Sequence, residues 1–120
     1  MYRASRGREG ERLAKKRLER LGYRILETNY RTAEGEIDIV AMEGDTVVFV
    51  EVKTRSRGGL TGAVEAIDSR KIKRISAAAL QYITDKALHN STVRFDVVAV
   101  DMSWFRPKIT LIKNAFESAI

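Results

Sequence analysis

The stretch from Gly35 to Arg55, G-E-I-D-I-V-A-M-E-G-D-T-V-V-F-V-E-V-K-T-R, decides the fold. Two runs rich in β-branched and apolar residues flank Gly44-Asp45, a pair typical of a tight two-residue turn. We therefore predict a β-hairpin with strands 36–43 and 46–55. The turn also fixes the register, because it places Glu43 opposite Thr46 and pairs the two strands outward from there.

In this register one face of the hairpin is wholly apolar and belongs to a core. Its residues are Ile37, Ile39, Ala41, Val48, Val50 and Val52. On the other face Asp38 falls opposite Glu51, and the Cβ atoms of directly opposed residues are only about 5 Å apart. A divalent cation would neutralise the two carboxylates, and so would Lys53, which points to the same face as Glu51. The alternative is an ordinary charged hairpin face in which Glu36 pairs with Lys53, and the pairing alone does not decide between the two.

The composition restricts the chemistry that the chain can support. It has no cysteine and one histidine, His89, which excludes disulfides and thiolate metal sites and argues against a His-rich zinc site or a Ser-His-Asp triad. Any metal site must then be built from carboxylates, which favour Mg²⁺ or Mn²⁺. The length of 120 residues predicts one domain, residues 1–120, with residues 1–6 as a mobile arm.

No apolar run in the sequence is long enough to cross a membrane, and the N-terminal residues lack the apolar segment of a secretory signal. We therefore expect a cytoplasmic protein with no membrane association.

Positive charge gathers in three parts of the chain. Residues 1–24 hold nine basic and three acidic residues, and this difference of six equals the whole net charge of +6. Further basic clusters lie at 53–57 and 70–74. Such a footprint favours a polyanion, above all nucleic acid, although a solvated helix face is the common alternative. Cations are disfavoured at a helix N-terminus, so the cluster at 70–74 indicates an external anion.

The residues predicted to contact nucleic acid are Arg8, Arg12, Lys15, Arg55, Arg57, Arg70, Lys71, Lys73 and Arg74. The segment 55–61 contains two adjacent glycines and follows the acid pair. It is either a loop that closes over a bound strand or a plain connector.

Hydrophobic periodicity and turn residues predict the other elements. They are a helix over 7–21, a strand over 23–30, a short helical turn at 63–67, a helix from Asp68 or Ser69 to about Lys86, a strand over 93–101 and an edge strand over 108–113. We thus predict an α/β fold whose sheet is mixed but mostly antiparallel and is flanked by helices.

Several single residues carry further expectations. Glu11 lies at the edge of the buried stripe of the first helix, so its partner is either an arginine of that helix or a metal. Asp96 is predicted to be a structural ion-pair partner. Trp104 and Phe105 are candidates for stacking on bases, although lone aromatic residues in turns more often cover a core. Phe116 is expected to dock the C-terminal tail.

Five stretches in order resemble the PD-(D/E)xK nuclease superfamily and, more closely, the YraN-type family of predicted endonucleases, which is distantly similar to archaeal Holliday junction resolvases. They are Gly10-Glu11, the run 35–40, the run 47–55 with Glu51-Val52-Lys53 at its centre, the run 94–98 and the run 114–116. The resemblance implies a restriction-endonuclease-like core with the order αβββαβ and a C-terminal edge strand.

The same resemblance implies roles for individual residues. Asp38 and Glu51 would be the metal carboxylates, Lys53 the catalytic lysine and Glu11 an accessory metal ligand. Ile37 stands where the superfamily motif has proline, a position that is loosely kept even among active nucleases.

Residues and resemblance together lead to one expectation. The protein would be an endonuclease dependent on Mg²⁺ or Mn²⁺ that hydrolyses DNA phosphodiester bonds, at branched or junction DNA, and contacts the DNA mainly through its backbone. A homodimer is compatible with this expectation. The alternatives are a non-catalytic nucleic-acid-binding protein that retains the nuclease fold, and a structural or assembly protein whose charges serve only solubility.

Overall fold

The computed structural model describes residues 2–55, 67–103 and 105–119, and the side chains from Gly7 onward within these ranges. The elements, in chain order, are α1 (Tyr2–Arg20), β1 (Arg24–Arg31), β2 (Glu36–Glu43), β3 (Thr46–Arg55), α3 (Ser69–Asp85), β4 (Thr92–Asp101) and β5 (Lys108–Ile112). The predicted order of helix, three strands, helix and two strands is confirmed. Helix α1 begins at Tyr2, so the terminal arm predicted over 1–6 is helical from its second residue.

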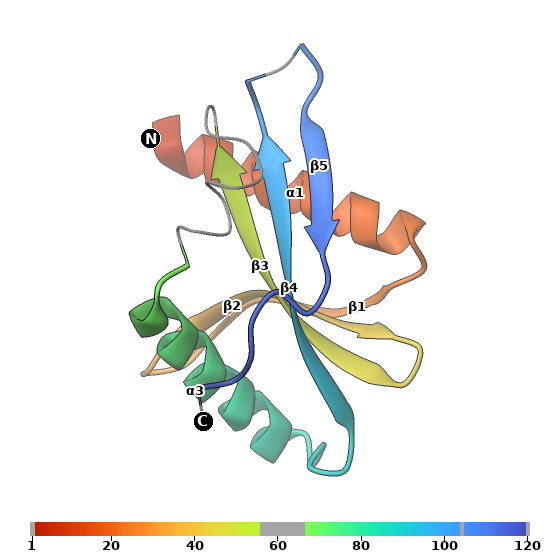
Figure 1. Ribbon diagram of the computed structural model, residues 1–120, viewed down its shortest axis with the longest axis vertical. Helices are drawn as coiled ribbons and strands as arrows, with labels where there is room; N and C mark the ends of the chain where they lie inside the picture. Colours follow the sequence, from red (N-terminus) through yellow and green to blue (C-terminus); the bar gives the residue numbers. More distant parts are fainter. Residues whose placement is uncertain (1, 56–66, 104, 120) are drawn as a thin grey trace.

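The sheet has five strands in the order β1-β2-β3-β4-β5. Every neighbouring pair is antiparallel except β3 and β4, which are parallel. A parallel pair requires a crossover, and α3 lies within the segment that makes it. The predicted α/β class and mostly antiparallel sheet are confirmed, and β5 lies at the predicted edge (Figure 1).

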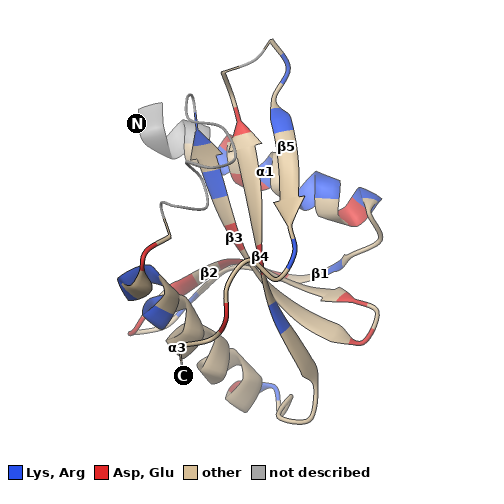
Figure 2. Cartoon of the chain, viewed as in Figure 1, with Lys and Arg blue, Asp and Glu red and all other residues tan. Residues whose placement is uncertain are grey.

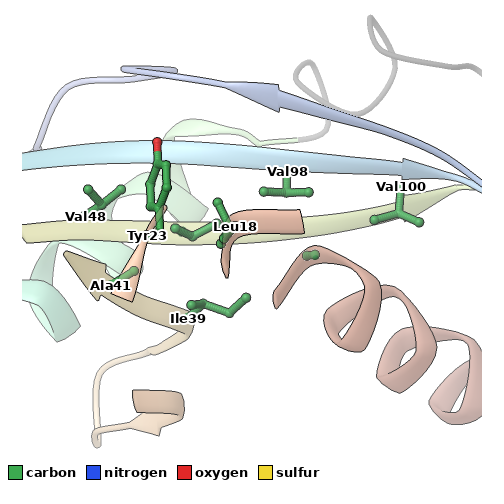
Figure 3. Packing of buried hydrophobic residues seen from close by; sticks show 9 residues of the cluster. Leu18, Tyr23, Ile39, Ala41, Val48, Val98 and Val100 are labelled. Atoms are coloured by element: carbon green, nitrogen blue, oxygen red, sulfur yellow. The ribbon is translucent and has the colours of Figure 1, made fainter. Parts of the chain in front are cut away.

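Two hydrophobic clusters cover the two faces of the sheet. Ala14 and Leu18 of α1 pack on one face against residues of β2, β3 and β4 (Figure 3). Ile75, Ala79 and Tyr82 of α3 pack on the other face, against β2, β3 and Phe95 of β4. Because β3 is buried on both faces from Val47 to Glu51, a polar side chain in this stretch can be kept only if it has partners.

The predicted hairpin register is confirmed from Glu43–Thr46 to Ile39–Val50, where the ladder between β2 and β3 ends. Beyond that point β2 continues beside β1, down to the pair Arg31–Glu36. The strict alternation predicted for β2 fails there, because Ile37 belongs to the cluster under α3 and not to the cluster of Ile39. Asn29, the β1 residue level with Asp38, has a positive φ of 53°, so β1 is also irregular at this position.

Two glycines permit the close contacts that surround this irregularity. A Cβ atom on Gly10 of α1 would lie 1.8 Å from Oγ1 of Thr54 on β3. A Cβ atom on Gly35, just before β2, would lie 2.4 Å from the backbone oxygen of Arg74 on α3. Backbone can approach this closely only where no side chain intervenes. The two contacts bring α1 and α3 to the part of the sheet that contains Asp38 and Glu51.

The C-terminal tail docks as predicted. The rings of Phe116 and Phe95 stack with centroids 5.1 Å apart, and the Ala115 N–H donates to the Phe95 carbonyl at 2.8 Å. No helix in the described ranges is long and apolar enough to span a membrane. Two predicted segments, the loop over 55–61 and the helical turn over 63–67, lie outside the described residues except at Arg55 and Ile67. Arg57 and Trp104 lie outside them as well.

Candidate functional site

The centre of the site is a pair of carboxyl groups, Asp38 on β2 and Glu51 on β3. The two residues lie one step beyond Ile39 and Val50, the last pair of the hairpin ladder. Asp38 Oδ2 accepts a hydrogen bond of 2.7 Å from the Val52 N–H. Elsewhere in the hairpin, backbone carbonyls of β2 accept the N–H groups of β3, so here the Asp38 carboxyl group replaces a backbone acceptor. The Glu51 side chain is only 4% exposed, and the two carboxyl groups hydrogen-bond to each other.

This contact strongly affects the acidity of Asp38. Burial, followed by the negative charge of Glu51, raises the pKa of Asp38 to about 8, and the Val52 N–H lowers it by less. The charge of Glu11 on α1 adds to the rise, so Glu11 is close enough to act on Asp38 electrostatically. Asp38 therefore keeps its proton at neutral pH.

Two lysines balance the remaining charge of Glu51. Lys53, on the same strand, has its Nζ atom 3.6 Å from Glu51 Oε2. Lys71, near the start of α3, has its Nζ atom 2.9 Å from the same oxygen. Burial lowers the pKa of Lys71, but the hydrogen bond that Lys71 donates to Glu51 and the charges of Glu51 and Asp38 outweigh this effect and raise the pKa. A buried carboxylate is thus held by the ends of two flexible side chains.

The structure brings together three of the residues predicted to form the site, Asp38, Glu51 and Lys53. Glu11 lies near them, yet within the described part of the chain no three acidic or histidine side chains form a group that could hold a metal. The alternative pairing of Glu36 with Lys53 is wrong, because Glu36 pairs with Arg31 at 3.1 Å. The arginine beside Glu11, Arg12, pairs with Glu9.

Lys71 is the residue whose place the sequence did not reveal. We expected the cations at the start of α3 to face an external anion, whereas Lys71 faces Glu51, an anion of the protein itself. The unfavourable position of a cation in the first turns of a helix was the correct signal. The identity of its partner depends on how α3 crosses the sheet, which no local pattern reveals.

The other residues predicted to contact nucleic acid lie on several elements. Arg8 and Lys15 are exposed on α1, and Arg70, Lys73 and Arg74 are exposed on α3. Arg55 ends β3, and Arg57 lies outside the described residues. In Figure 2, blue marks the Lys and Arg positions of the ribbon along α1, at the N-terminal end of α3 and at the end of β3.

The family of the chain follows from sequence comparison. A model of a family described as an uncharacterised protein family, UPF0102, matches residues 10–100. The chain belongs to the UPF0102 family. This membership confirms the resemblance to the YraN-type proteins, and the matched region contains Glu11, Asp38, Glu51, Lys53 and Lys71.

UPF0102 proteins of several bacteria are similar to the chain over nearly their whole length. One from Geobacter metallireducens is 45% identical over 99% of this chain and 98% of its own. One from Syntrophus aciditrophicus is 49% identical over 94% of this chain and 89% of its own. One from Moorella thermoacetica is 44% identical over 97% of this chain and 98% of its own. Their names state the family and no activity.

Proposed function

We propose that this UPF0102 protein is a metal-dependent endonuclease that hydrolyses DNA phosphodiester bonds. The observation that carries the proposal is the contact between Asp38 and Glu51, two carboxyl groups that face each other in a largely buried place beside two lysines. A fold gains nothing in stability from opposing two acids in this way, because one of them must take up a proton. Such an arrangement is typical of a site that receives a cation and a phosphate.

The residues present suit Mg²⁺ or Mn²⁺. Both ions prefer hard oxygen ligands, and both carboxyl groups offer them from neighbouring strands. Asp38 and Glu51 would hold the ion, with Glu11 assisting from α1. A bound divalent ion supplies Lewis-acid chemistry, which polarises a phosphoryl oxygen and acidifies a water molecule. Asp38 would give up its proton on binding the ion.

The lysines would act on the substrate. Lys53 is 23% exposed on its side chain, so its ammonium can reach both Glu51 and solvent. In this proposal it orients the attacking water and offsets the charge that develops on the phosphate. Lys71 is 42% exposed on its side chain and binds Glu51 in the place to which a metal cation would be attracted. It would move from Glu51 to a phosphate oxygen of the DNA when a metal binds.

The substrate proposed is DNA, at branched or junction sites, and bound mainly through its phosphates. The exposed basic residues Lys15, Arg70, Lys73 and Arg74 support backbone contact, since Lys and Arg on a surface neutralise phosphates and release counterions. This mode of contact positions a nucleic acid without reading its sequence.

One observation favours the alternative of a non-catalytic nucleic-acid-binding protein with the same fold. Lys53 and Lys71 already neutralise Glu51 without any metal. In addition, Glu11 does not complete a group of three acids with the pair in the described part of the chain. A protein that had lost catalysis could keep this arrangement as an internal ion pair.

The test is a nuclease assay on linear, nicked, flapped and four-way DNA with Mg²⁺ or Mn²⁺, beside the Asp38→Asn variant. We expect cleavage by the parent protein, none in EDTA and none by the variant, which keeps the shape of the side chain. DNA binding without cleavage by either protein would support the non-catalytic alternative. If cleavage persisted at the parental rate in Asp38→Asn, the assigned site would be wrong.

A further inference from the structure

The ring of Phe105, in the turn between β4 and β5, lies entirely in solvent, with a relative exposure of 101%. The other aromatic side chains that the structure describes are buried or pack against a core. They are Tyr23, Tyr30, Phe49, Tyr82, Phe95 and Phe116. An exposed phenylalanine ring gains none of the stabilisation that burial of its apolar surface would give. A ring placed in this way is most readily explained by a partner that covers it.

Phe105 borders an open hollow of about 640 Å³. The hollow is lined by Arg17, Phe105, Arg106, Pro107, Lys108 and Ile109, and none of these lining residues is acidic. The Arg17 guanidinium of α1 donates to the Ile109 carbonyl of β5 at 3.1 Å, which ties the helix to this edge of the sheet. Arg17, Phe105, Arg106 and Lys108 form a surface that combines an exposed ring with three cations. We call it the hairpin surface, after the hairpin of β4 and β5 and not that of β2 and β3.

The hairpin surface lies at the same end of the sheet as the end of β3 (Figure 1). Arg55, the last residue of β3, is paired with Asp101 of β4, and the Met102 N–H donates to the Arg55 carbonyl at 2.6 Å. Glu51 is paired with Val97. The four residues from Val97 to Asp101 span roughly 13 Å of strand. A DNA strand covers that distance in about four nucleotides at 3.4 Å each.

We propose that the hairpin surface binds an unpaired segment of DNA, with one base stacked on the ring of Phe105 and the neighbouring phosphates against Arg17, Arg106 and Lys108. Aromatic rings bordered by cations are the usual means of binding single strands, because every base has a face for stacking and every nucleotide a phosphate. A paired duplex does not offer the same contact, since its bases are already stacked. A second copy of this chain is disfavoured, because it would bring three cations against three cations.

This inference goes beyond the proposed function, because it requires neither a metal nor cleavage. It adds a requirement to the substrate, namely an unpaired segment a few nucleotides away from Glu51. Flaps, gaps and junction arms contain such segments, and an intact linear duplex does not.

The experiment compares the binding of a labelled oligothymidylate and a blunt duplex of equal length at low salt in EDTA. Phe105→Ala should weaken binding of the oligothymidylate by about 5- to 150-fold, the effect of losing one base–aromatic stack of about 1–3 kcal/mol. Duplex affinity should change less than about twofold. Phe105→Tyr should bind as the parent does, because it keeps a ring. Leu80→Ala, which removes another exposed apolar side chain from α3, should leave both affinities unchanged.

Two further readouts locate the contact. Trp104 is the only tryptophan of the chain and adjoins Phe105 in sequence, so its fluorescence should change when the oligothymidylate binds. Sedimentation of the parent protein and Phe105→Ala should give the same mass. A parent dimer that Phe105→Ala converts to a monomer would overturn the proposal in favour of an interface between copies.

The proposal is also overturned if Phe105→Ala binds the oligothymidylate as the parent does, or weakens both DNAs equally. A parent that cleaves or binds duplex but does not bind the oligothymidylate would refute this inference and leave the proposed function intact. Selective loss of oligothymidylate binding in Phe105→Ala, together with no cleavage of any substrate, would refute the nuclease and leave this inference intact.

Discussion

Two buried acidic clusters in this protein are built in different ways. Asp96 on β4 is completely buried and accepts hydrogen bonds from Arg94 at 2.8 and 2.9 Å, from the Tyr23 hydroxyl at 3.1 Å and from the Asn114 N–H at 3.0 Å. Asp38 accepts one backbone N–H and faces another acid. The first cluster satisfies its charge with donors from three separate segments of the chain, whereas the second leaves its charge to be balanced by the flexible ends of two lysines.

This difference separates a structural acid from a candidate functional acid. The carboxylate of Asp96 raises the pKa of Arg94, through their hydrogen bonds above all, so Arg94 stays charged across the accessible pH range. Burial and then Asp96 itself raise the pKa of Tyr23, which keeps the hydroxyl protonated and able to donate. Asp38, in contrast, has a pKa of about 8 and changes its charge near neutral pH. Burial is common to both sites, so it does not distinguish them, whereas the opposition of two acids does and makes Asp38 the candidate for a functional acid.

The largest effect on folding should come from Asp96→Asn. The substitution removes the buried charge that Arg94, whose side chain is 20% exposed, binds at 2.8 Å. Arg94 then keeps only Glu43, whose side chain is 31% exposed, as a carboxylate partner at 2.8 Å. Removing one partner of a buried ion pair costs about 3 kcal/mol or more. Urea unfolding in EDTA should show this loss at every pH from 6 to 9, and Mg²⁺ should not change its size. A loss below about 1 kcal/mol would show that the hydrogen bonds of Tyr23 and Asn114 suffice, and would weaken the contrast between the clusters.

Asp38→Asn should have the opposite effect on stability. The folded pKa of Asp38 lies above its ordinary value of 3.8, at about 8. The contribution of this proton to stability is therefore complete below about pH 4 and is lost as the pH rises through 8. In EDTA the parent protein should lose roughly 3 kcal/mol of unfolding free energy, relative to Asp38→Asn, between pH 6 and pH 9. Asparagine keeps the shape and the hydrogen-bonding capacity of the side chain but has no charge to lose.

The same pair of proteins tests for metal binding. Mg²⁺ should raise the melting temperature of the parent protein and not that of Asp38→Asn, because a ligand of the folded state stabilises it by mass action. Parallel stability curves in EDTA, combined with no response to Mg²⁺ in either protein, would make Asp38 a structural residue like Asp96.

The sequence was sufficient for whatever depends on local pattern. The alternation of side chains along the two strands and the Gly44-Asp45 turn predicted the β2–β3 hairpin and its register. They also predicted that Asp38 and Glu51 lie near each other. Helical spacing gave α1 and α3 to within a few residues, except at the start of α1. These features are encoded within a few neighbouring residues, which is why they can be predicted.

Features that depend on the crossing of distant elements were not predictable. The end of the ladder beyond Ile39 and the change of face at Ile37 arise where β1 and β2 turn away together from β3. The approach of Lys71 to Glu51 depends on the packing of α3, which Gly35 permits. The sequence indicated that Asp96 has an ion-pair partner, but not that Tyr23 and Asn114 also bind it.

The smallest effect, and the sharpest test of the flexible cluster, is expected from Lys71→Met. If Lys71 holds the place of a metal ion at Glu51, removing its ammonium should tighten Mg²⁺ binding in the absence of DNA. Two charges about 4 Å apart interact by about 1 kcal/mol in a water-like medium, which corresponds to roughly a fivefold change in affinity. Titration calorimetry would measure it directly, without any need for nuclease activity.

Lys73→Met is the matched control for this prediction, because Lys73 lies in the same turn of α3 but is exposed. Its loss should change Mg²⁺ affinity by less than about twofold, since water and salt screen an exposed charge. The Lys53 ammonium, 3.6 Å from Glu51, remains in both variants, so Glu51 keeps one counter-charge and the fold should persist. Equal affinities in the parent protein and Lys71→Met would mean that metal and lysine occupy different places. A weaker affinity in Lys71→Met would mean that Lys71 supports the metal site and does not compete for it. The contact between Lys71 and Glu51 would then be a fixed part of the site, as the contact between Arg94 and Asp96 is.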